Sequence, residues 1–335
     1  MNALTELQKL NRSYNAIREK VCVNPGNRFT EFLNIQGNIV RLPSVVRDFD
    51  PEFEDYPKSN ESTIVIEHTS VSNKQKHTRL YAVGSLAKTL KGKAAFDKGK
   101  LNLMQDLVFA ALEPNHEQDI LRVENLLIAV PDVRNTDAIA TVKSLEGTYD
   151  ITRNGKDLIV TVAKATAIEE ATAAYKYGIK NGLYQWQDAI NGVIDFGGGT
   201  SSGRLYTPEG VPIREASITL PGTNALGHAI QARLLKATGQ SPDIGAILDG
   251  IESGSYTTGH NGVSFAAYFD VCRAQWLDDI RSTARGQWIS YLPDLGEVLL
   301  VGGSAPLAST IEESSSGRFK IAPRSQDITI LGMAI

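Results

Sequence analysis

Hydrophobic positions along this chain fall into short apolar runs and longer amphipathic segments, a pattern that predicts strands interleaved with helices. In residues 1–20 the apolar side chains recur every three or four positions, which places them on one face of a helix. They are Leu4, Leu7, Leu10, Tyr14 and Ile17. The opposite face is mixed in charge and does not favour a membrane surface. We expect this helix to pack on the body of the protein, or alternatively to contact another subunit or partner.

The first half of the remaining chain reads as strands with few helices. Strands are expected at residues 20–23, 28–35, 38–42, 63–68 and 78–83, and a helical region at 99–113. Residues 126–130 form a continuous apolar run ending at Pro131, which is typical of a central parallel strand, and residues 134–144 suit a crossover helix. Residues 147–153 and 157–164 predict a hairpin around Asn154-Gly155. A helix over 169–181 is expected to end at Gly182.

The second half repeats this alternation of strands and helices. A buried strand ends at Asp195, and further strands are expected at 203–206, 216–220 and 297–301. Helices are expected at 224–237 and 263–290. Strands that alternate with helices over the whole length indicate an α/β fold.

Composition narrows the class of protein. A chain of 335 residues suggests two domains, and 42% hydrophobic with 21% charged residues is ordinary for a globular protein. The net charge of −4 provides no broad basic field, so direct nucleic-acid binding is not expected. The two cysteines, Cys22 and Cys272, argue against a disulfide scaffold. With no signal pattern and no apolar run of about 18 residues, we expect a cytoplasmic protein without a membrane span.

Candidate chemistry centres on the segment after the strand that ends at Asp195. Three consecutive glycines, Gly197–Gly199, let backbone N–H groups approach an anion closely, and Thr200 adds a hydroxyl donor. A carboxylate at the strand end can hold hydrated Mg²⁺. The segment therefore predicts a phosphate loop with a metal-holding acid, although a simple glycine-rich hairpin would show the same pattern.

Four glycine-bearing turns follow a strand or precede a helix, at residues 24–27, 195–199, 221–224 and 302–305. Two of them are matched strand–glycine–hydroxyl loops that lie in different halves of the chain. Such a layout would clamp a nucleotide between two similar domains.

With these motifs, residues 20–335 resemble the actin/Hsp70/sugar-kinase ATPase superfamily, and within it the bacterial actin-like proteins of the ParM group. Residues 194–200 (IDFGGGT) resemble the second phosphate loop, 299–305 (LLVGGSA) the adenosine loop, and 221–226 (PGTNAL) a segment near the nucleotide. Residues 168–178 resemble the segment with the catalytic glutamate, and LPSVV (42–46) and YAVGSLA (81–87) are typical of ParM-like proteins.

The resemblance implies an actin-like ATPase fold, in which two similar α/β domains flank an interdomain nucleotide cleft. It places an N-terminal helical extension at 1–20, domain I at 21–188 and 310–335, and domain II at 189–309. It implies ATP or GTP with Mg²⁺ as cofactors, Glu170 and Asp195 as catalytic residues, and Asp195 as the Mg²⁺ ligand through water. The implied nucleotide-binding residues are Gly26, Asn27, Arg28, Gly197, Gly198, Gly199, Thr200, Gly222, Asn224, Gly302, Gly303 and Ser304.

The first phosphate loop departs from the family pattern. Asn24 stands where the family has an aspartate, and Glu31 stands where a lysine is common. Reversing a charge near phosphates is worth on the order of a few kcal/mol at an effective dielectric of about 20. Arg28 compensates if it turns inward. Slow ATP or GTP hydrolysis is therefore expected, and nucleotide binding with little hydrolysis is the alternative.

The resemblance further implies a nucleotide-switched, head-to-tail filament, with a small DNA-binding adaptor protein as partner and plasmid segregation as the task. The alternatives are a cell-shape cytoskeleton and a non-polymerising kinase of the same superfamily.

The remaining candidate residues have simpler structural interpretations. The lysines between 88 and 100 suit a solvated face or a contact with an acidic neighbour, His228 and His260 lack metal partners at ligand spacing, and the three tryptophans suit core or interface positions.

Overall fold

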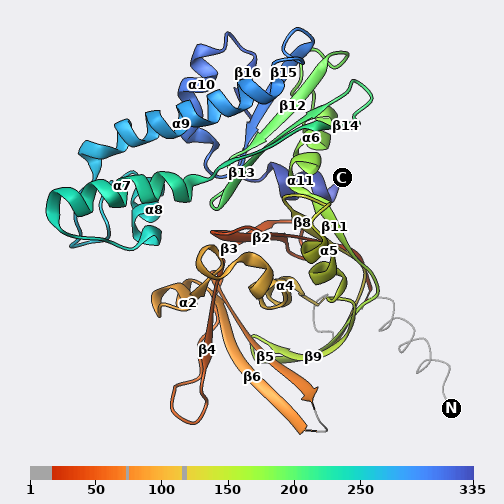
Figure 1. The fold of residues 1–335 in the computed structure, drawn as a ribbon. Coiled ribbons are helices and arrows are strands. Elements are labelled where there is room, and N and C mark those ends of the chain that lie inside the picture. The colour runs from red at the N-terminus through yellow and green to blue at the C-terminus, as the bar shows by residue number, and fades with distance from the viewer. Residues whose placement is uncertain (1–16, 73–74, 115–118) are drawn as a thin grey trace. The chain divides into compact units, whose positions relative to one another are not determined.

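The computed structural model describes residues 17–72, 75–114 and 119–335. The chain divides into two compact units, each described by itself below. Unit 1 comprises the residues up to Glu170 together with Met333–Ile335, and unit 2 comprises Ala171–Gly332. Figure 1 shows the elements with their labels.

Unit 1 is built on an 11-stranded mixed sheet. Its order is β3-β2-β1-β8-β10-β9-β5-β6-β4-β7, with β11 also paired to β8. The strands are β1 (Ile17–Pro25), β2 (Phe29–Leu33), β3 (Ile39–Pro43), β4 (Val45–Phe49), β5 (Thr63–Ser72), β6 (Gln75–Gly84), β7 (Lys93–Ala94), β8 (Ile120–Val130), β9 (Gly147–Arg153), β10 (Lys156–Val162) and β11 (Ala165–Glu169). The helices are α2 (Ser85–Thr89), α3 (Ala95–Lys98), the 3-10 turn η1 (Lys100–Leu103), α4 (Met104–Ala111) and α5 (Thr136–Lys143).

The centre of unit 1 is the long strand β8, which pairs in parallel with β1, β10 and β11. Helix α4 packs on this sheet with every residue except Gln105 buried. A helix buried on nearly all sides depends on the core around it, so α4 fixes the position of the η1 turn that precedes it.

Unit 2 is built on a five-stranded sheet of order β14-β13-β12-β15-β16. The strands are β12 (Ile190–Asp195), β13 (Thr200–Tyr206), β14 (Pro212–Pro221), β15 (Leu295–Val301) and β16 (Phe319–Ile321). The helices are α6 (Glu170–Lys180), α7 (Thr223–Thr238), α8 (Ile244–Glu252), α9 (Ala266–Trp288), η2 (Ala305–Ala308), α10 (Ser309–Ser314) and α11 (Ile328–Ala334). All seven residues of β15 are buried, as expected for a strand covered on both faces.

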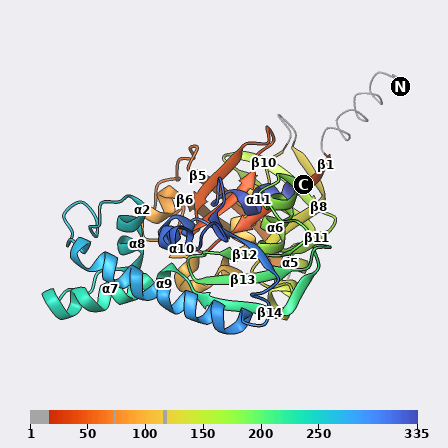
Figure 2. The same cartoon turned by 90° about the horizontal axis from the view of Figure 1, so that it is seen from above.

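The long helix α9 packs beside the edge strand β14 (Figure 2). Two indole groups of α9 donate hydrogen bonds to carbonyl groups of β14. Trp276 Nε1 donates to the Pro221 carbonyl at 3.0 Å, and Trp288 Nε1 donates to the Ala216 carbonyl at 2.7 Å. Both side chains are buried, as their core assignment predicts, whereas Trp186 is half exposed. The Pro221 contact holds the segment that leads into α7.

The expected α/β class is confirmed, and so are most of the individual elements. The hairpin around Asn154-Gly155 forms β9 and β10, with both turn residues at positive φ. Several elements differ from expectation; strands β4 and β11 and helix α2, for example, were not predicted. Residues 17–20 belong to β1 and not to a helix, because they pair with β8, while the rest of the 1–20 prediction lies outside the described residues. Strand β13 begins earlier, at Thr200, and α8 was not expected.

The compact units do not share the expected domain limits. Unit 1 ends at Glu170 and resumes at Met333, while the expected division lies at 188/189 and 309/310. The division into domains I and II stays a prediction, since compactness alone does not test it. Among the helices of the described residues, we find none with the length and apolarity needed to span a bilayer.

Candidate functional site

Asp195 occupies the end of β12 in unit 2. The apolar run of β12 keeps the strand inside the sheet, and Asp195 is itself only 8% exposed. The chain then turns through Phe196–Gly199 and returns antiparallel as β13, with Asp195 opposite Ser202. The segment is therefore a glycine-rich hairpin in its geometry, and what the turn binds depends on where its polar groups point.

The N-terminus of α7 fixes the direction of the glycine turn. Thr223 N donates to the Gly197 carbonyl at 3.1 Å, and Asn224 N donates to the Gly198 carbonyl at 2.8 Å. In a trans peptide the next N–H points opposite to the carbonyl, so the N–H groups of Gly198 and Gly199 point away from α7. Within the part of the chain that the structure describes, neither group donates a backbone hydrogen bond. Such paired N–H groups are suited to an anion.

Close approach explains why residue 222 is glycine. A Cβ at Gly222 would lie 2.6 Å from the Gly198 carbonyl oxygen, so a side chain there would push α7 away from the turn. Gly222 precedes α7 directly, and the first turn of α7 contains no acid. The positive end of the helix dipole therefore faces the glycine turn without an acid in the first turn of α7 itself.

The second glycine turn follows β15, the parallel neighbour of β12, and lies against Asp195. Gly302 has φ +89°, and a Cβ there would lie 2.4 Å from Asp195 Oδ1. Its N–H donates to the Ser325 carbonyl at 2.7 Å. Ser304 joins the same cluster, because its N–H donates to the Phe196 carbonyl at 3.4 Å. Its hydroxyl donates to Thr223 Oγ1 at the same distance.

Unit 2 thus brings together the predicted residues of segments 195–200, 222–224 and 302–304. Thr200, the first residue of β13, is exposed, while Asn224 is half-buried and its buried Oδ1 has no hydrogen-bond partner. Two neighbours were not predicted. Gln326 has its Cδ 3.5 Å from the position of a Cβ at Gly303, and Ser325 contacts Gly302. No sequence motif marks residues 325–326, because they reach the cluster only through the tertiary fold.

The cluster has one carboxylate for a cation. Among the described residues, no group of three or more His, Cys, Asp or Glu side chains could hold a metal ion. Mg²⁺ usually keeps several waters and binds proteins through one or two carboxylates plus phosphate oxygens. A single acid beside an anion-binding turn fits that mode, and Asp195 is the residue that would hold the ion.

The predicted first phosphate loop is the β1–β2 hairpin of unit 1. Gly26 lies in its turn with Asn27 and Arg28, and Gly26 N donates to the Phe29 carbonyl at 2.9 Å. A Cβ at Gly26 would lie 2.6 Å from that same oxygen, which explains the glycine. The guanidinium of Arg28 lies over the Phe29 ring, 5.7 Å from its centroid.

The atypical Glu31 is neutralised inside unit 1. It is 4% exposed and pairs across the β2–β3 hairpin with Arg41, whose Nε lies 2.8 Å from Glu31 Oε1. Asn24 Nδ2 donates to the other carboxylate oxygen at 3.3 Å. The two unusual residues of this loop therefore form one hydrogen-bonded set with Arg41, which sequence analysis did not single out. The hairpin register of β2 and β3 is the signal that could have revealed it.

Glu170, the expected catalytic glutamate, is the first residue of α6. Its Oε1 lies 2.6 Å from Lys100 Nζ, and both residues belong to unit 1. Lys100 is the last lysine of the run between residues 88 and 100, for which a solvated face was expected. The other lysines of that run are exposed, but Lys100 is not.

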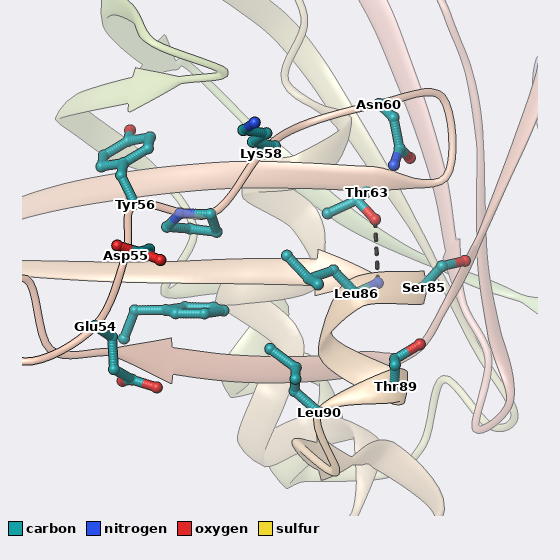
Figure 3. Close-up of a pocket in the computed structure, with 12 residues that line it drawn as sticks. Glu54, Asp55, Tyr56, Lys58, Asn60, Thr63, Ser85, Leu86, Thr89 and Leu90 are labelled. Carbon is teal, nitrogen blue, oxygen red and sulfur yellow. Dashed lines mark hydrogen bonds between the residues drawn. The ribbon is translucent and has the colours of Figure 1, made fainter.

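A pocket of about 700 Å³ lies elsewhere in unit 1, between β4, the following loop and α2. Figure 3 shows its lining, which includes Glu54, Tyr56, Lys58 and Leu90, and the hydrogen bond of 3.1 Å from Leu86 N to Thr63 Oγ1. It contains none of the predicted site residues.

Comparisons with known proteins identify the fold. No protein-family model matches the chain, and neither does any curated protein sequence. Among solved structures, the archaeal actin homolog Ta0583 aligns with a TM-score of 0.74 at 18% identity, covering 94% of this chain and 98% of that one. Apo psk41 ParM aligns with a TM-score of 0.66 at 16% identity, covering 95% and 96%. A 15-stranded ParM filament from Clostridium botulinum gives 0.71 at 14%, covering 94% and 98%.

The chain therefore has the actin-like fold, shared over nearly its whole length with archaeal and bacterial actin homologues. The resemblance inferred from short motifs is confirmed at the level of fold.

Proposed function

We propose that this protein is a ParM-like actin homologue that binds ATP or GTP with Mg²⁺ and polymerises into nucleotide-dependent filaments. The observation that carries the proposal is the convergence of three glycine-bearing segments on Asp195 within unit 2. This cluster joins an anion-binding turn, a helix N-terminus and one carboxylate in a chain with the actin-like fold. A structure of Ta0583 in complex with ADP aligns with this chain at a TM-score of 0.71 and 16% identity, which supports a nucleotide as ligand.

Each group in the cluster has a role in this proposal. The N–H groups of Gly198 and Gly199 bind phosphate oxygens, and Asp195 holds the hydrated metal ion, which supplies charge neutralisation when bound. Gly302, Gly303 and Ser304 form the adenosine loop implied by the resemblance. The β1–β2 turn of unit 1 supplies the first phosphate loop.

Hydrolysis in this scheme depends on Glu170. Water attack on a phosphoryl group requires an oriented water and neutralised charge, and Glu170 orients the water while Asp195 serves the metal ion. The buried Glu31 set leaves the first loop without the usual lysine, so we propose slow turnover.

Self-assembly is the second part of the proposal. The Clostridium botulinum ParM and Alp12 structures that align with this chain are of filaments, which supports polymerisation of this one. Head-to-tail contacts that do not close into a ring generate open filaments. A small DNA-binding adaptor and plasmid segregation complete the proposal, with a cell-shape cytoskeleton as the alternative use. No observation favours the kinase alternative.

Sedimentation of the purified full chain tests the proposal. We expect the protein to pellet with Mg²⁺ and ATP or GTP, to stay in the supernatant without nucleotide, and to release phosphate slowly. EDTA should abolish pelleting. A protein that binds neither nucleotide, or that stays in the supernatant with both, would refute the proposal.

A further inference from the structure

Lys100 and Glu170 form an ion pair in which both side chains are largely shielded from solvent. The Lys100 side chain is 11% exposed and the Glu170 side chain 16%, with 2.6 Å between Nζ and Oε1. By contrast, Lys93 pairs with Asp48 at a side-chain exposure of 56%. Removing two charges from water costs free energy unless they are paired at good geometry. The short distance of the Lys100–Glu170 pair meets that condition, which distinguishes it from an ordinary exposed surface ion pair.

The backbone conformation around Gly99 places Lys100 beside Glu170. Gly99 has φ +81°, a conformation that favours glycine, and it turns the chain from the exposed end of α3 into η1. The buried residues Leu103, at the end of η1, and Met104, at the start of α4, anchor the turn in the core of unit 1. The lysine two positions earlier, Lys98, remains exposed.

The negative charge of Glu170 is stabilised at its position even without Lys100. It is the first residue of α6, a helix of 11 residues, where the helix dipole already favours a carboxylate. The lysine adds direction, because an ammonium group on Oε1 restricts rotation of the carboxylate and leaves Oε2 for another donor. A water molecule is the donor that phosphoryl transfer to water requires.

We propose that Lys100 is a positioning residue for hydrolysis, holding Glu170 so that its Oε2 orients the attacking water. This inference rests on the proposed function, since it assumes that Glu170 serves nucleotide hydrolysis. Lys100 acts through Glu170 and needs no contact with the nucleotide. Its loss should therefore lower kcat and leave nucleotide affinity nearly unchanged.

The test compares Lys100→Met, which keeps the length of the side chain and removes its charge, with Lys98→Met as the matched control. We expect Lys100→Met to lower kcat about 10- to 100-fold, the range for a misoriented catalytic group, with the Kd for nucleotide changed less than about twofold. Lys100→Arg should recover part of kcat, because it restores a cation for the carboxylate. Lys98→Met should match wild type.

A double-variant cycle separates positioning from a structural role. In a Glu170→Gln background, Lys100→Met should change kcat by less than about twofold, since residues that act as a unit are not additive. Wild-type turnover in Lys100→Met, or equal losses of kcat in both backgrounds, would overturn the inference while leaving the proposed function in place. A raised kcat would also overturn it and would make the ion pair an inhibitory contact. A wild-type protein that binds nucleotide without turning it over would refute the proposed hydrolysis, and the inference with it.

Discussion

Gly302→Ala tests the contact between the second glycine turn and Asp195. Gly302 has φ +89°, and its Cβ would lie 2.4 Å from Asp195 Oδ1 and 2.7 Å from the Phe196 carbonyl oxygen. The left-handed conformation costs a non-glycine residue about 1–2 kcal/mol. Relief of the overlap, by moving buried backbone or the carboxylate, adds about 1–3 kcal/mol. We expect a total loss of about 2–5 kcal/mol in the free energy of unfolding.

Gly317→Ala is the matched control, because Gly317 has φ +85° and nothing lies within 4 Å of its Cβ position. Gly317→Ala should lower the free energy of unfolding only by the cost of the left-handed conformation, about 1–2 kcal/mol. All three tryptophans of the chain lie in unit 2, so their fluorescence during urea unfolding reports on this unit. Titration with Mg²⁺-nucleotide should show weakened binding for Gly302→Ala alone. Equal stability and equal affinity in the two variants would refute the argument that Gly302 is needed for close approach to Asp195.

Three further predictions concern unit 1 and the N-terminus. Arg41→Ala should destabilise the protein by up to about 3 kcal/mol, because it removes the cation that pairs with the buried Glu31. Adding Glu31→Gln should restore much of the loss, as measured by denaturation followed by circular dichroism. Burial raises the pKa of the Cys22 thiol from 9.0 to about 11, so its contribution to stability is complete below the unfolded value and is lost as pH rises toward 11. Between about pH 8 and about pH 10, wild type should lose about 1.4 kcal/mol more than Cys22→Ala, and an equal loss would contradict this. Deletion of residues 1–16 should preserve nucleotide binding and change the sedimentation of the protein. Deletion of residues 1–18 should also lower the free energy of unfolding, because Arg18 donates two hydrogen bonds to backbone carbonyls. Equal stability of the two truncated proteins would count against this role of Arg18.

The sequence predicted those parts of the fold that depend on local rules. Asn154 and Gly155 both tolerate positive φ and therefore specify the β9–β10 turn. The glycine turns after β12 and β15 were predicted from the consecutive glycines that follow each apolar strand, and the motif resemblance predicted the actin-like fold. Residues 17–19 were missed because Ile17 fits the apolar period of the expected N-terminal helix, and pairing with β8 decided the outcome.

The candidate site was predicted residue by residue but not as a set of contacts. Sequence placed Asp195 and Gly302 in separate motifs, and their close approach depends on the parallel pairing of β12 with β15. Arg41 and Lys100 were not predicted as partners of Glu31 and Glu170 for the same reason. Each partner comes from another element, and a lysine within a basic run looks solvated until the core around it is known.

Electron microscopy of the purified full chain tests the central claim most directly. Samples with Mg²⁺-ATP, with Mg²⁺-GTP and without nucleotide should be compared at equal protein concentration. The account predicts filaments with at least one nucleotide and dispersed particles without any. Dispersed particles under all three conditions, or the same filaments with and without nucleotide, would contradict it.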